Sequence, residues 1–504
     1  MNLTSIKTLG ELIQDGYRSK AIKDELRDNL INFLKEKINP FDGIIGFDDT
    51  VIPDLQTAVL SRHDILLLGL RGQAKTKIAR LMINLLDEYI PIVEGSELND
   101  DPLNPLSVLA KEIISIDGDK TKIAWIHRSE RYTEKLATPD VSVADLIGDV
   151  DPIKAAALKL PYSDERVIHF GLIPRSHRGI FVINELPDLQ ARIQVALFNI
   201  LQESDIQIRG FKVRLPLDIQ FIFTANPEDY TNRGSIVTPL KDRIDSQILT
   251  HYPKSLDISK RITQQEAKLA EEQRQNINSD DVLLDLVEQI AFEARASEYI
   301  DSKSGVSARL SISAYENLIS TAERRRILNN EKETHLRLSD LYGVIPSITG
   351  KIELVYEGEQ EGPAKVAQIL IGKAIKNNFT KYYPSPDSLK KSQQPSPYQP
   401  IIDWFKKGNK TDLMINLSDK EYSNLLEKIP QLENVAKKFQ PSLNGKSRLL
   451  LMEFLLFGLS EYSLLSRAKI EDGIQFKDML SSMFTMPKVD EDFEDEDDES
   501  QYKL

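Results

Sequence analysis

Residues 69–76, GLRGQAKT, have the residue types and spacing of a phosphate-binding loop. The pattern for such a loop is strand, G-x-x-x-x-G-K-[ST], helix, and its backbone N–H groups wrap the phosphates. Gly69, Lys75 and Thr76 match this pattern, whereas Ala74 stands where the second glycine belongs. Alanine is the next smallest residue after glycine, so this departure weakens the match without excluding it. A plain structural corner between a strand and a helix is the alternative interpretation.

If the loop binds phosphate, Lys75 would lie on the β- and γ-phosphates and the Thr76 hydroxyl would hold Mg²⁺. The loop and the start of the following helix would then supply the nucleotide contacts, namely Gly69, Gly72, Gln73, Ala74, Lys75, Thr76 and Lys77. A loop of this kind also predicts a second strand that ends in acidic residues.

The segment GIFVINEL, residues 179–186, is a candidate for that second strand because it ends in Asn184 and Glu185. In P-loop ATPases this strand usually ends in Asp-Glu, where the Asp orients the Mg²⁺ shell and the Glu polarises the attacking water. Glu185 is therefore the candidate general base, and Thr76, Asn184 and Glu185 are the candidate metal residues. Asn184 can accept a hydrogen bond from metal-bound water but brings no negative charge. Alone, INE also fits a buried strand that meets a turn.

A third strand, IQFIFTA, ends at Thr224 and is followed by Asn226. A polar residue at the tip of this strand could hold the water against the γ-phosphate. An ordinary Asn-Pro turn explains the same residues.

The rest of the chain places these motifs in an α/β core. Short apolar runs (HDILLLG, KIAWIH, GIFVIN, IQFIFTA) alternate with helical stretches, as expected for buried parallel strands, and Arg209-Gly210 lies at the tip of an expected hairpin. We expect seven segments along the chain. They are an N-terminal helical segment (1–40), the α/β core (41–252), a helical lid (253–345), a helical extension (346–381), a Pro/Ser/Gln-rich linker (382–400), a C-terminal helical domain (401–487) and an acidic disordered tail (488–504).

Composition and charge limit the function classes. The chain has 504 residues, 41% of them hydrophobic, and no run of about 18 apolar residues. No signal peptide is apparent and cysteine is absent, so we expect cytoplasmic residence without disulfides or thiolate metal sites. The formal net charge is −14, and −5 without the nine acidic residues in 490–499. An acidic chain is a poor match for DNA, so a nucleic acid is not an expected partner. Because no long apolar run occurs, a membrane is not an expected partner either.

The histidines show no ligand spacing, and a structural zinc site is not expected; they are His63, His127, His169, His177, His251 and His335. The mixed-charge segment RVIHFGLIPRSHRG is interpreted as the lead into the second strand rather than as a nucleic-acid patch. The acidic tail could alternatively be a docking arm for a basic partner.

Taken together, GLRGQAKT, GIFVINELPDL and TANPEDYTNRGSIVTPLKDRI resemble an AAA+ ATPase of the magnesium chelatase (ChlI/BchI-like)/MoxR group, in its bacterial magnesium-chelatase-like branch. The resemblance covers roughly residues 41–345. It implies an AAA+ P-loop NTPase core, a parallel sheet flanked by helices, with an α-helical lid and an α-helical C-terminal domain.

The resemblance also implies roles that spacing alone could not identify. Ile45 and Gly46 in IIGFDD match the segment that closes over adenine, Arg243 matches the arginine finger that reaches a neighbouring subunit, and Arg309 matches the lid arginine called sensor 2. Arg178 is a weaker candidate for a residue acting in trans. A trans arginine can be worth about 10³ to 10⁵ in rate because it neutralises charge on the transferring phosphoryl group. A surface salt bridge is the alternative for each arginine.

These features predict an ATP- and Mg²⁺-dependent ring motor, a homo-oligomer and expected hexamer, that remodels a partner protein or assists metal insertion. The resemblance implies a separate partner with a von Willebrand A domain. A nucleotide-gated scaffold with weak or no hydrolysis is the main alternative, because of Asn184 and Ala74. A bacterial enhancer-binding transcription activator is less favoured, since the sequence has no G-A-F-T-G-A loop and no basic helix-turn-helix after the core.

Overall fold

The computed structural model describes residues 5–162, 164–203, 205–208, 214–227, 235–391, 395–470 and 473–479. The chain divides into two compact units: Met1–Ile262 with Asp301–Arg309, and Thr263–Ile300 with Leu310–Leu504. In the described part of the chain, no helix is both long and apolar enough to cross a bilayer.

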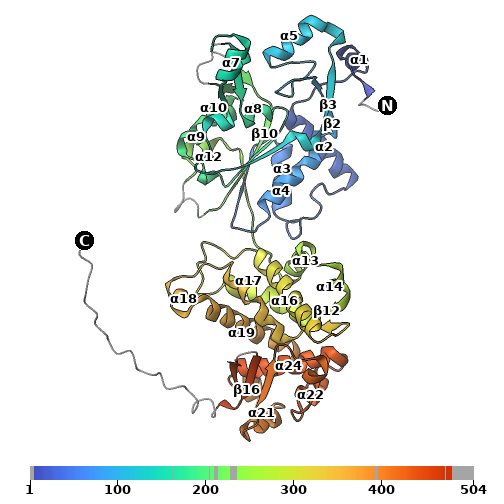
Figure 1. Ribbon diagram of the computed structural model, residues 1–504, viewed down its shortest axis with the longest axis vertical. Helices are drawn as coiled ribbons and strands as arrows, with labels where there is room; N and C mark the ends of the chain where they lie inside the picture. The colour runs from blue at the N-terminus through green and yellow to red at the C-terminus, as the bar shows by residue number, and fades with distance from the viewer. Residues whose placement is uncertain are drawn as a thin grey trace, which may run out of the picture. The chain divides into compact units, whose positions relative to one another are not determined.

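The first unit is built around a five-stranded sheet whose neighbouring strands are all parallel (Figure 1). The three central strands are buried at every residue, which is typical of a parallel sheet covered on both faces. In spatial order the strands are β11 (Ser246–Leu249), β1 (Ile65–Leu68), β10 (Ile219–Ala225), β7 (Gly179–Asn184) and β4 (Tyr132–Leu136).

Alternate residues of each strand enter two separate hydrophobic clusters. Leu66 and Phe223 belong to one cluster, and Leu67 and Ile222 belong to the other, because successive side chains point to opposite faces of a sheet. The first face is covered by α6 (Val143–Leu146), α8 (Leu172–Arg175), α9 (Ala191–Ala196), α10 (Phe198–Glu203) and α12 (Thr238–Arg243). The second is covered by α2 (Ile22–Glu36), α3 (Val51–Leu60) and α4 (Lys75–Leu81).

The predicted α/β core is confirmed, and one strand assignment is wrong. KIAWIH forms β3 (Ile123–His127), which pairs antiparallel with β2 (Tyr89–Val93) outside the main sheet. The edges of the main sheet are instead β4 and β11, neither of which has a long apolar run. The expected hairpin is present as antiparallel β8 (Asp205–Gln207) and β9 (Arg214–Pro216), while its tip at Arg209-Gly210 lies outside the described residues.

Smaller elements complete the first unit. The two helices expected near the N-terminus are α1 (Leu9–Gln14) and α2, and α2 ends at Lys37 in the left-handed conformation. The others are α5 (Val108–Asp117), β5 (Gly148–Val150), α7 (Pro152–Leu158), β6 (Ile168–Phe170), the 3₁₀ helices η2 (Met82–Leu85), η3 (Gly118–Lys120), η4 (Arg128–Arg131), η5 (Glu165–Val167) and η6 (Leu186–Asp188), and most of α13 (Leu256–Glu266).

The second unit is mainly helical. Helices α15 (Asp281–Arg295) and α24 (Gly445–Glu461) both pack against α19 (Pro363–Tyr382). Most of α16 (Arg309–Leu328) also belongs to this unit. The remaining elements up to residue 391 are α14 (Glu271–Asn276), the parallel pair β12 (Ile277–Asn278) and β13 (Thr334–His335), η7 (Leu338–Val344), α17 (Ile345–Thr349), α18 (Tyr356–Glu361) and α20 (Pro386–Lys391).

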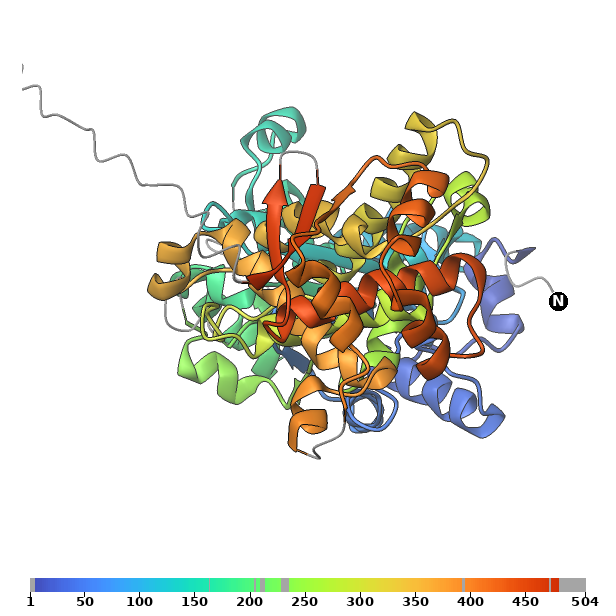
Figure 2. The ribbon, with the colours of Figure 1, turned by 90° about the horizontal axis from the view of Figure 1, so that it is seen from below.

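The C-terminal part combines helices with a small sheet that the sequence did not indicate. Its helices are α21 (Gln399–Lys406), α22 (Asp419–Glu427), α23 (Leu432–Phe439) and α24. The strands β14 (Thr411–Met414), β16 (Gly473–Lys477) and β15 (Ser466–Ile470) pair antiparallel in that order, and Figure 2 shows strands of this sheet as red arrows. The expected acidic tail lies outside the described residues.

The structure also differs from the expected linker at 382–400. Tyr383 and Tyr398 are buried, and their hydroxyls donate to the carbonyls of Leu451 (2.8 Å) and Pro384 (2.6 Å). Tyrosine rings with satisfied hydroxyls are core residues, so the described parts of this segment, 382–391 and 395–400, pack as part of the second unit.

Candidate functional site

The glycine-rich loop joins β1 to α4 and contains two residues with left-handed backbone angles. Gly72 has φ +73° and Ala74 has φ +56°. A side chain at Gly72 would collide with Ser307, so this position needs glycine for space as well as for conformation. Ala74 adopts a left-handed backbone angle that glycine adopts more easily, so the motif usually has glycine at this position. For alanine the left-handed conformation costs on the order of 1–2 kcal/mol. Left-handed turns of this kind aim backbone N–H groups into a concave nest for anions.

Lys75 lies in the centre of the loop and is nearly buried, with 7% of its surface exposed. Its ammonium group donates to the Leu70 carbonyl at 3.0 Å, to the Gly69 carbonyl, and to Oδ1 of Asn226 at 2.8 Å. These contacts hold the ammonium group at the centre of the loop, where an anion bound by the loop would lie close to it.

Asn226 connects the loop to the second strand. It follows β10, accepts from Lys75, and donates through Nδ2 to Oε2 of Glu185 at 3.3 Å. Glu185 follows β7 and has left-handed backbone angles (φ +54°, ψ 50°). Three polar residues from distant parts of the chain therefore meet at the carboxyl edge of the sheet, because β1, β10 and β7 are parallel neighbours.

Asn184 is the last residue of β7 and is buried. Its amide oxygen accepts from the Thr224 hydroxyl at 3.0 Å and from the Thr76 hydroxyl at 3.5 Å. Thr224 also accepts the backbone N–H of Glu185 at 3.2 Å. The predicted metal residues Thr76 and Asn184 thus face each other, with Glu185 next in the chain. Among the described residues, no three His, Asp or Glu side chains gather in a way that could hold a metal.

The other predicted nucleotide contacts surround this centre. Gln73 accepts the Thr250 hydroxyl at 2.7 Å, so its side chain supports the loop from behind. Lys77 donates to the Gly43 carbonyl at 3.0 Å, just before Ile45 and Gly46. Gly46 has φ +83°, and a side chain there would collide with Ile258.

The segment Asp301–Arg309 belongs to the first unit and lies against the loop. Arg71 donates to the Ser304 carbonyl at 3.3 Å, and Gly72 faces Ser307. Arg309 follows this contact as the first residue of α16, and its side chain is exposed.

Arg243 and Arg178 differ in their surroundings. Arg243 ends α12, where it donates to Gln202 (3.1 Å) and Pro239 (2.7 Å) and lies over the Phe198 ring at 5.0 Å. It is partly exposed, and within the described part of the chain no hydrogen bond or ion pair joins it to the loop residues. Arg178 is only 5% exposed and donates to the Pro91 carbonyl at 2.8 Å, so a role in trans is wrong for this residue.

Sequence reasoning missed Glu134 on β4. Its Oε1 accepts a hydrogen bond from Nδ2 of Asn184 at 2.7 Å. The same carboxylate accepts hydrogen bonds from the Arg80 guanidinium (2.8 and 3.1 Å) and from the Tyr132 hydroxyl (3.2 Å). Burial, with the Glu134 charge, raises the pKa of Tyr132 well above its usual range. No sequence motif marks Glu134; only the pairing of β4 with β7 brings it to the site.

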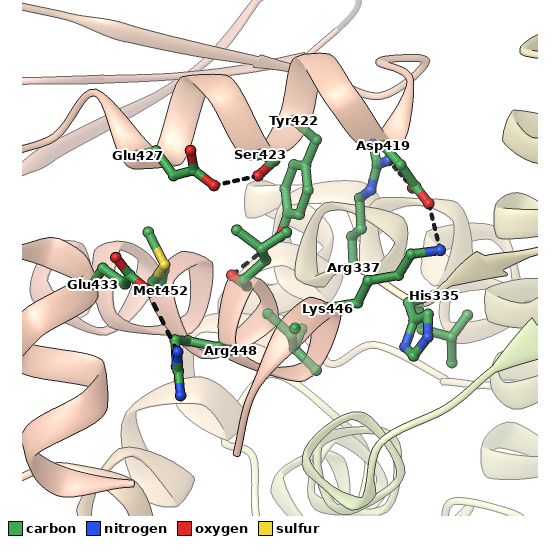
Figure 3. A pocket seen from close by; sticks show the side chains of 14 residues that line it. His335, Arg337, Asp419, Tyr422, Ser423, Glu427, Glu433, Lys446, Arg448 and Met452 are labelled. Atoms are coloured by element: carbon green, nitrogen blue, oxygen red, sulfur yellow. Dashed lines mark hydrogen bonds and ion pairs between the residues drawn. The ribbon is translucent and has the colours of Figure 1, made fainter. Parts of the chain in front are cut away.

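A separate cavity of about 360 Å³ lies in the second unit, between residues 335–337 and the helices α22 to α24 (Figure 3). Charged side chains that line it form ion pairs with one another. Asp419 pairs with Arg337 (2.7 Å) and Lys446 (2.8 Å), and Glu433 pairs with Arg448 (3.5 Å). Its lining, within the described residues, includes none of the predicted site residues.

Residues 161–247, which carry Asn184, Glu185, Asn226 and Arg243, match the model of the Sigma-54 interaction domain. Solved structures that match this chain include NtrX from Brucella abortus in complex with ATP (12% identity, 70% of this chain and 65% of that chain, TM-score 0.34). Another is a complex between subunits BchI and BchD of magnesium chelatase (20% identity, 64% of this chain and 98% of that chain, TM-score 0.33). A third is a putative ATPase from Cytophaga hutchinsonii (16% identity, 69% of this chain and 95% of that chain, TM-score 0.28).

The chain spans less than two thirds of the NtrX chain, at 65% of its length. The five-stranded parallel sheet, the helices on both of its faces and the loop after β1 form an α/β P-loop core of the AAA+ type, accompanied by helical domains.

Proposed function

We propose that this chain binds ATP with Mg²⁺ and hydrolyses it as an AAA+ motor of the magnesium chelatase/MoxR type. The observation that carries the proposal is the contact chain from Lys75 through Asn226 to Glu185. A phosphate-binding cation, a polar residue that can orient water, and a carboxylate that can accept its proton are thereby joined. This is the set of groups that phosphoryl transfer to water requires.

The residues of the loop fit an Mg²⁺-nucleotide. Backbone N–H groups around Gly72 and Ala74 suit phosphate oxygens, and the hydroxyl and amide oxygens of Thr76 and Asn184 are of the kind that Mg²⁺ prefers. When bound, the metal ion supplies charge neutralisation to the β- and γ-phosphates.

The chain's own groups then have distinct tasks. Lys75 exchanges its carbonyl contacts for phosphate oxygens, Asn226 orients the water, and Glu185 takes the proton from that water. Ile45 and Gly46 border the base. Arg243 completes the site of a neighbouring subunit, and Arg309 contacts the nucleotide from the lid side.

The larger assembly is part of the same proposal. A trans role for Arg243 requires a ring, for which six subunits are our expectation, acting in the cytoplasm on a partner with a von Willebrand A domain. The exposed position of Arg309 and the partly exposed position of Arg243 are compatible with these roles. The neutral Asn184 favours the second candidate, a scaffold that binds nucleotide and hydrolyses it weakly.

The test is to measure nucleotide affinity and ATP turnover with Mg²⁺ for the wild type and two variants. Lys75→Ala should lower ATP affinity at least tenfold. Glu185→Gln should retain binding and lose at least 100-fold in turnover, because only the proton acceptor is removed. Lys111→Ala, an exposed lysine on α5, is the control and should match the wild type. Tight binding without turnover in the wild type would favour the scaffold, and no binding would refute both candidates.

A further inference from the structure

Glu134 lies where it can act on the proposed metal site. In the pairing of β4 with β7, Glu134 is opposite Val182 and Leu136 is opposite Asn184. Glu134 and Asn184 are therefore diagonal neighbours on one face of the sheet, within reach of each other. The Glu134 side chain is 22% exposed, and its Oε1 lies 2.7 Å from Nδ2 of Asn184.

The carboxylate determines which way the Asn184 amide points. A carboxylate only accepts hydrogen bonds, so Asn184 must turn its NH₂ group toward Glu134. The amide oxygen is then directed to the hydroxyls of Thr76 and Thr224. Thr224 accepts the backbone N–H of Glu185, which leaves its own proton for the amide oxygen and agrees with this orientation.

The local charge also depends on Glu134. At this strand end a P-loop ATPase usually has an Asp, whose negative charge attracts the metal shell. Asn184 supplies the oxygen without the charge, and Glu134 supplies a charge directly behind the amide. Arg80 pairs with Glu134, but 63% of the Arg80 side chain is exposed, so water screens much of its positive charge.

We propose that Glu134 and Asn184 together replace the usual aspartate: Asn184 presents the oxygen toward Mg²⁺ at Thr76, and Glu134 fixes its orientation and supplies the negative charge. Glu134 is thus a positioning residue. This inference rests on the proposed function, since it concerns the same Mg²⁺-nucleotide site.

The experiment is a Mg²⁺ titration of the binding of a fluorescent ATP analogue to the full chain, starting in EDTA. Glu134→Gln should raise the Mg²⁺ concentration at half-saturation by about 10- to 100-fold, as loss of an outer-shell partner of a metal ligand does. Its nucleotide binding without Mg²⁺ should stay at the wild-type level. Glu97→Gln removes an exposed carboxylate that pairs with Lys154 at 3.0 Å, and it should behave as the wild type.

The decisive variant exchanges the two groups. In Glu134→Gln/Asn184→Asp the carboxylate moves to the strand end and the amide moves to β4, so one charge and one hydrogen bond are kept. We expect its half-saturation to return to within about threefold of the wild type, a coupling that independent structural damage would not produce. If Glu134→Gln also weakens binding without Mg²⁺, the exchange variant alone decides the matter.

Two results would overturn the inference while leaving the proposed function intact. One is a Glu134→Gln titration equal to that of a wild type that responds to Mg²⁺. The other is an exchange variant as weak as the single variant. A wild type that binds no nucleotide with or without Mg²⁺ would refute the proposed function itself.

Discussion

Ala74 and Glu185 both hold left-handed backbone angles, with φ +56° and +54°. For non-glycine residues such angles cost on the order of 1–3 kcal/mol of conformational free energy each, and they persist only where the surrounding structure stabilises them. At Ala74 the demand is the turn of the loop, and at Glu185 it is the bond from its N–H to Thr224. Ala74 directly precedes Lys75, and Glu185 is the other end of the contact chain, so both strained residues belong to the proposed site.

Two buried groups beside the N-terminal segment should give folding an unusual pH dependence. Burial lowers the pKa of His177 to about 4, so its contribution to stability is full above its ordinary value of 6.5 and is lost as the pH falls toward 4. Burial raises the pKa of Asp218 to about 6, so its contribution is present below 3.8 and is lost as the pH rises toward 6. Between pH 4 and 6 the two effects oppose each other.

Asp218→Asn should remove one side of this balance. The variant should lose about 2–3 kcal/mol of unfolding free energy between pH 6 and 4 relative to the wild type. Urea unfolding can be followed in the first unit by Trp125 fluorescence after Trp404→Phe, since these are the two tryptophans of the chain. Parallel pH profiles for the two proteins would show that Asp218 does not titrate as described.

At the residue scale the sequence predicted the loop, the ends of two strands and their polar residues, because fixed spacing defines a loop and strand ends are visible in apolar runs. Glu134 could not be found in this way. Its contact with Asn184 depends on the register of two strands whose residues lie 50 positions apart, and register is a property of the assembled sheet.

At the scale of elements, a buried ion pair fastens α2 to the core. The carboxylate of Glu25 on α2 accepts two hydrogen bonds from the Arg131 guanidinium, at 2.6 and 2.7 Å, and one from the backbone N–H of Asp87 at 2.7 Å. Arg131 also donates to the carbonyl of Arg178, beside β7. Helix α2 is thereby joined to the segments that lead into β4 and β7.

Neutralising Glu25 of the Glu25–Arg131 pair should destabilise the first unit strongly. Glu25→Gln leaves the Arg131 charge buried without its counter-ion, and we expect a loss of about 3–5 kcal/mol in urea unfolding. Asp28→Asn on the same helix is the matched control, because its pair with Lys20 (3.1 Å) is nearly half exposed and should cost under about 1 kcal/mol. Equal losses in the two variants would contradict the account.

The elements that the sequence failed to predict share a physical cause. The edge strands β4 and β11 are only partly buried, so they lack the continuous apolar run of the central strands. KIAWIH has an apolar run but forms β3 of a two-stranded pair, in which only Ile123 and Ile126 are buried. An apolar run therefore indicates a strand and does not show which sheet that strand joins.

At the scale of the whole molecule, Thr263–Ile300 and Leu310–Leu504 form one compact unit, which joins most of the expected lid to the C-terminal part. Glu453 on α24 is fully buried and accepts the backbone N–H groups of Leu338 and Ser339 (2.7 and 3.0 Å) and the Tyr422 hydroxyl (2.8 Å). Burial raises the pKa of Glu453. The composition of residues 382–400 suggested solvated chain because Pro, Ser and Gln outnumber the two tyrosines that anchor it.

Steady-state ATP turnover per chain, measured against protein concentration, shows whether this chain hydrolyses ATP as an assembled motor. We predict that turnover of the wild type climbs with concentration as subunits meet, and that Arg243→Ala binds ATP but loses at least 100-fold in turnover at every concentration, since a trans arginine stabilises the transferring phosphoryl group. Turnover per chain that is constant from the lowest concentration upward, with Arg243→Ala equal to the wild type, would contradict the account.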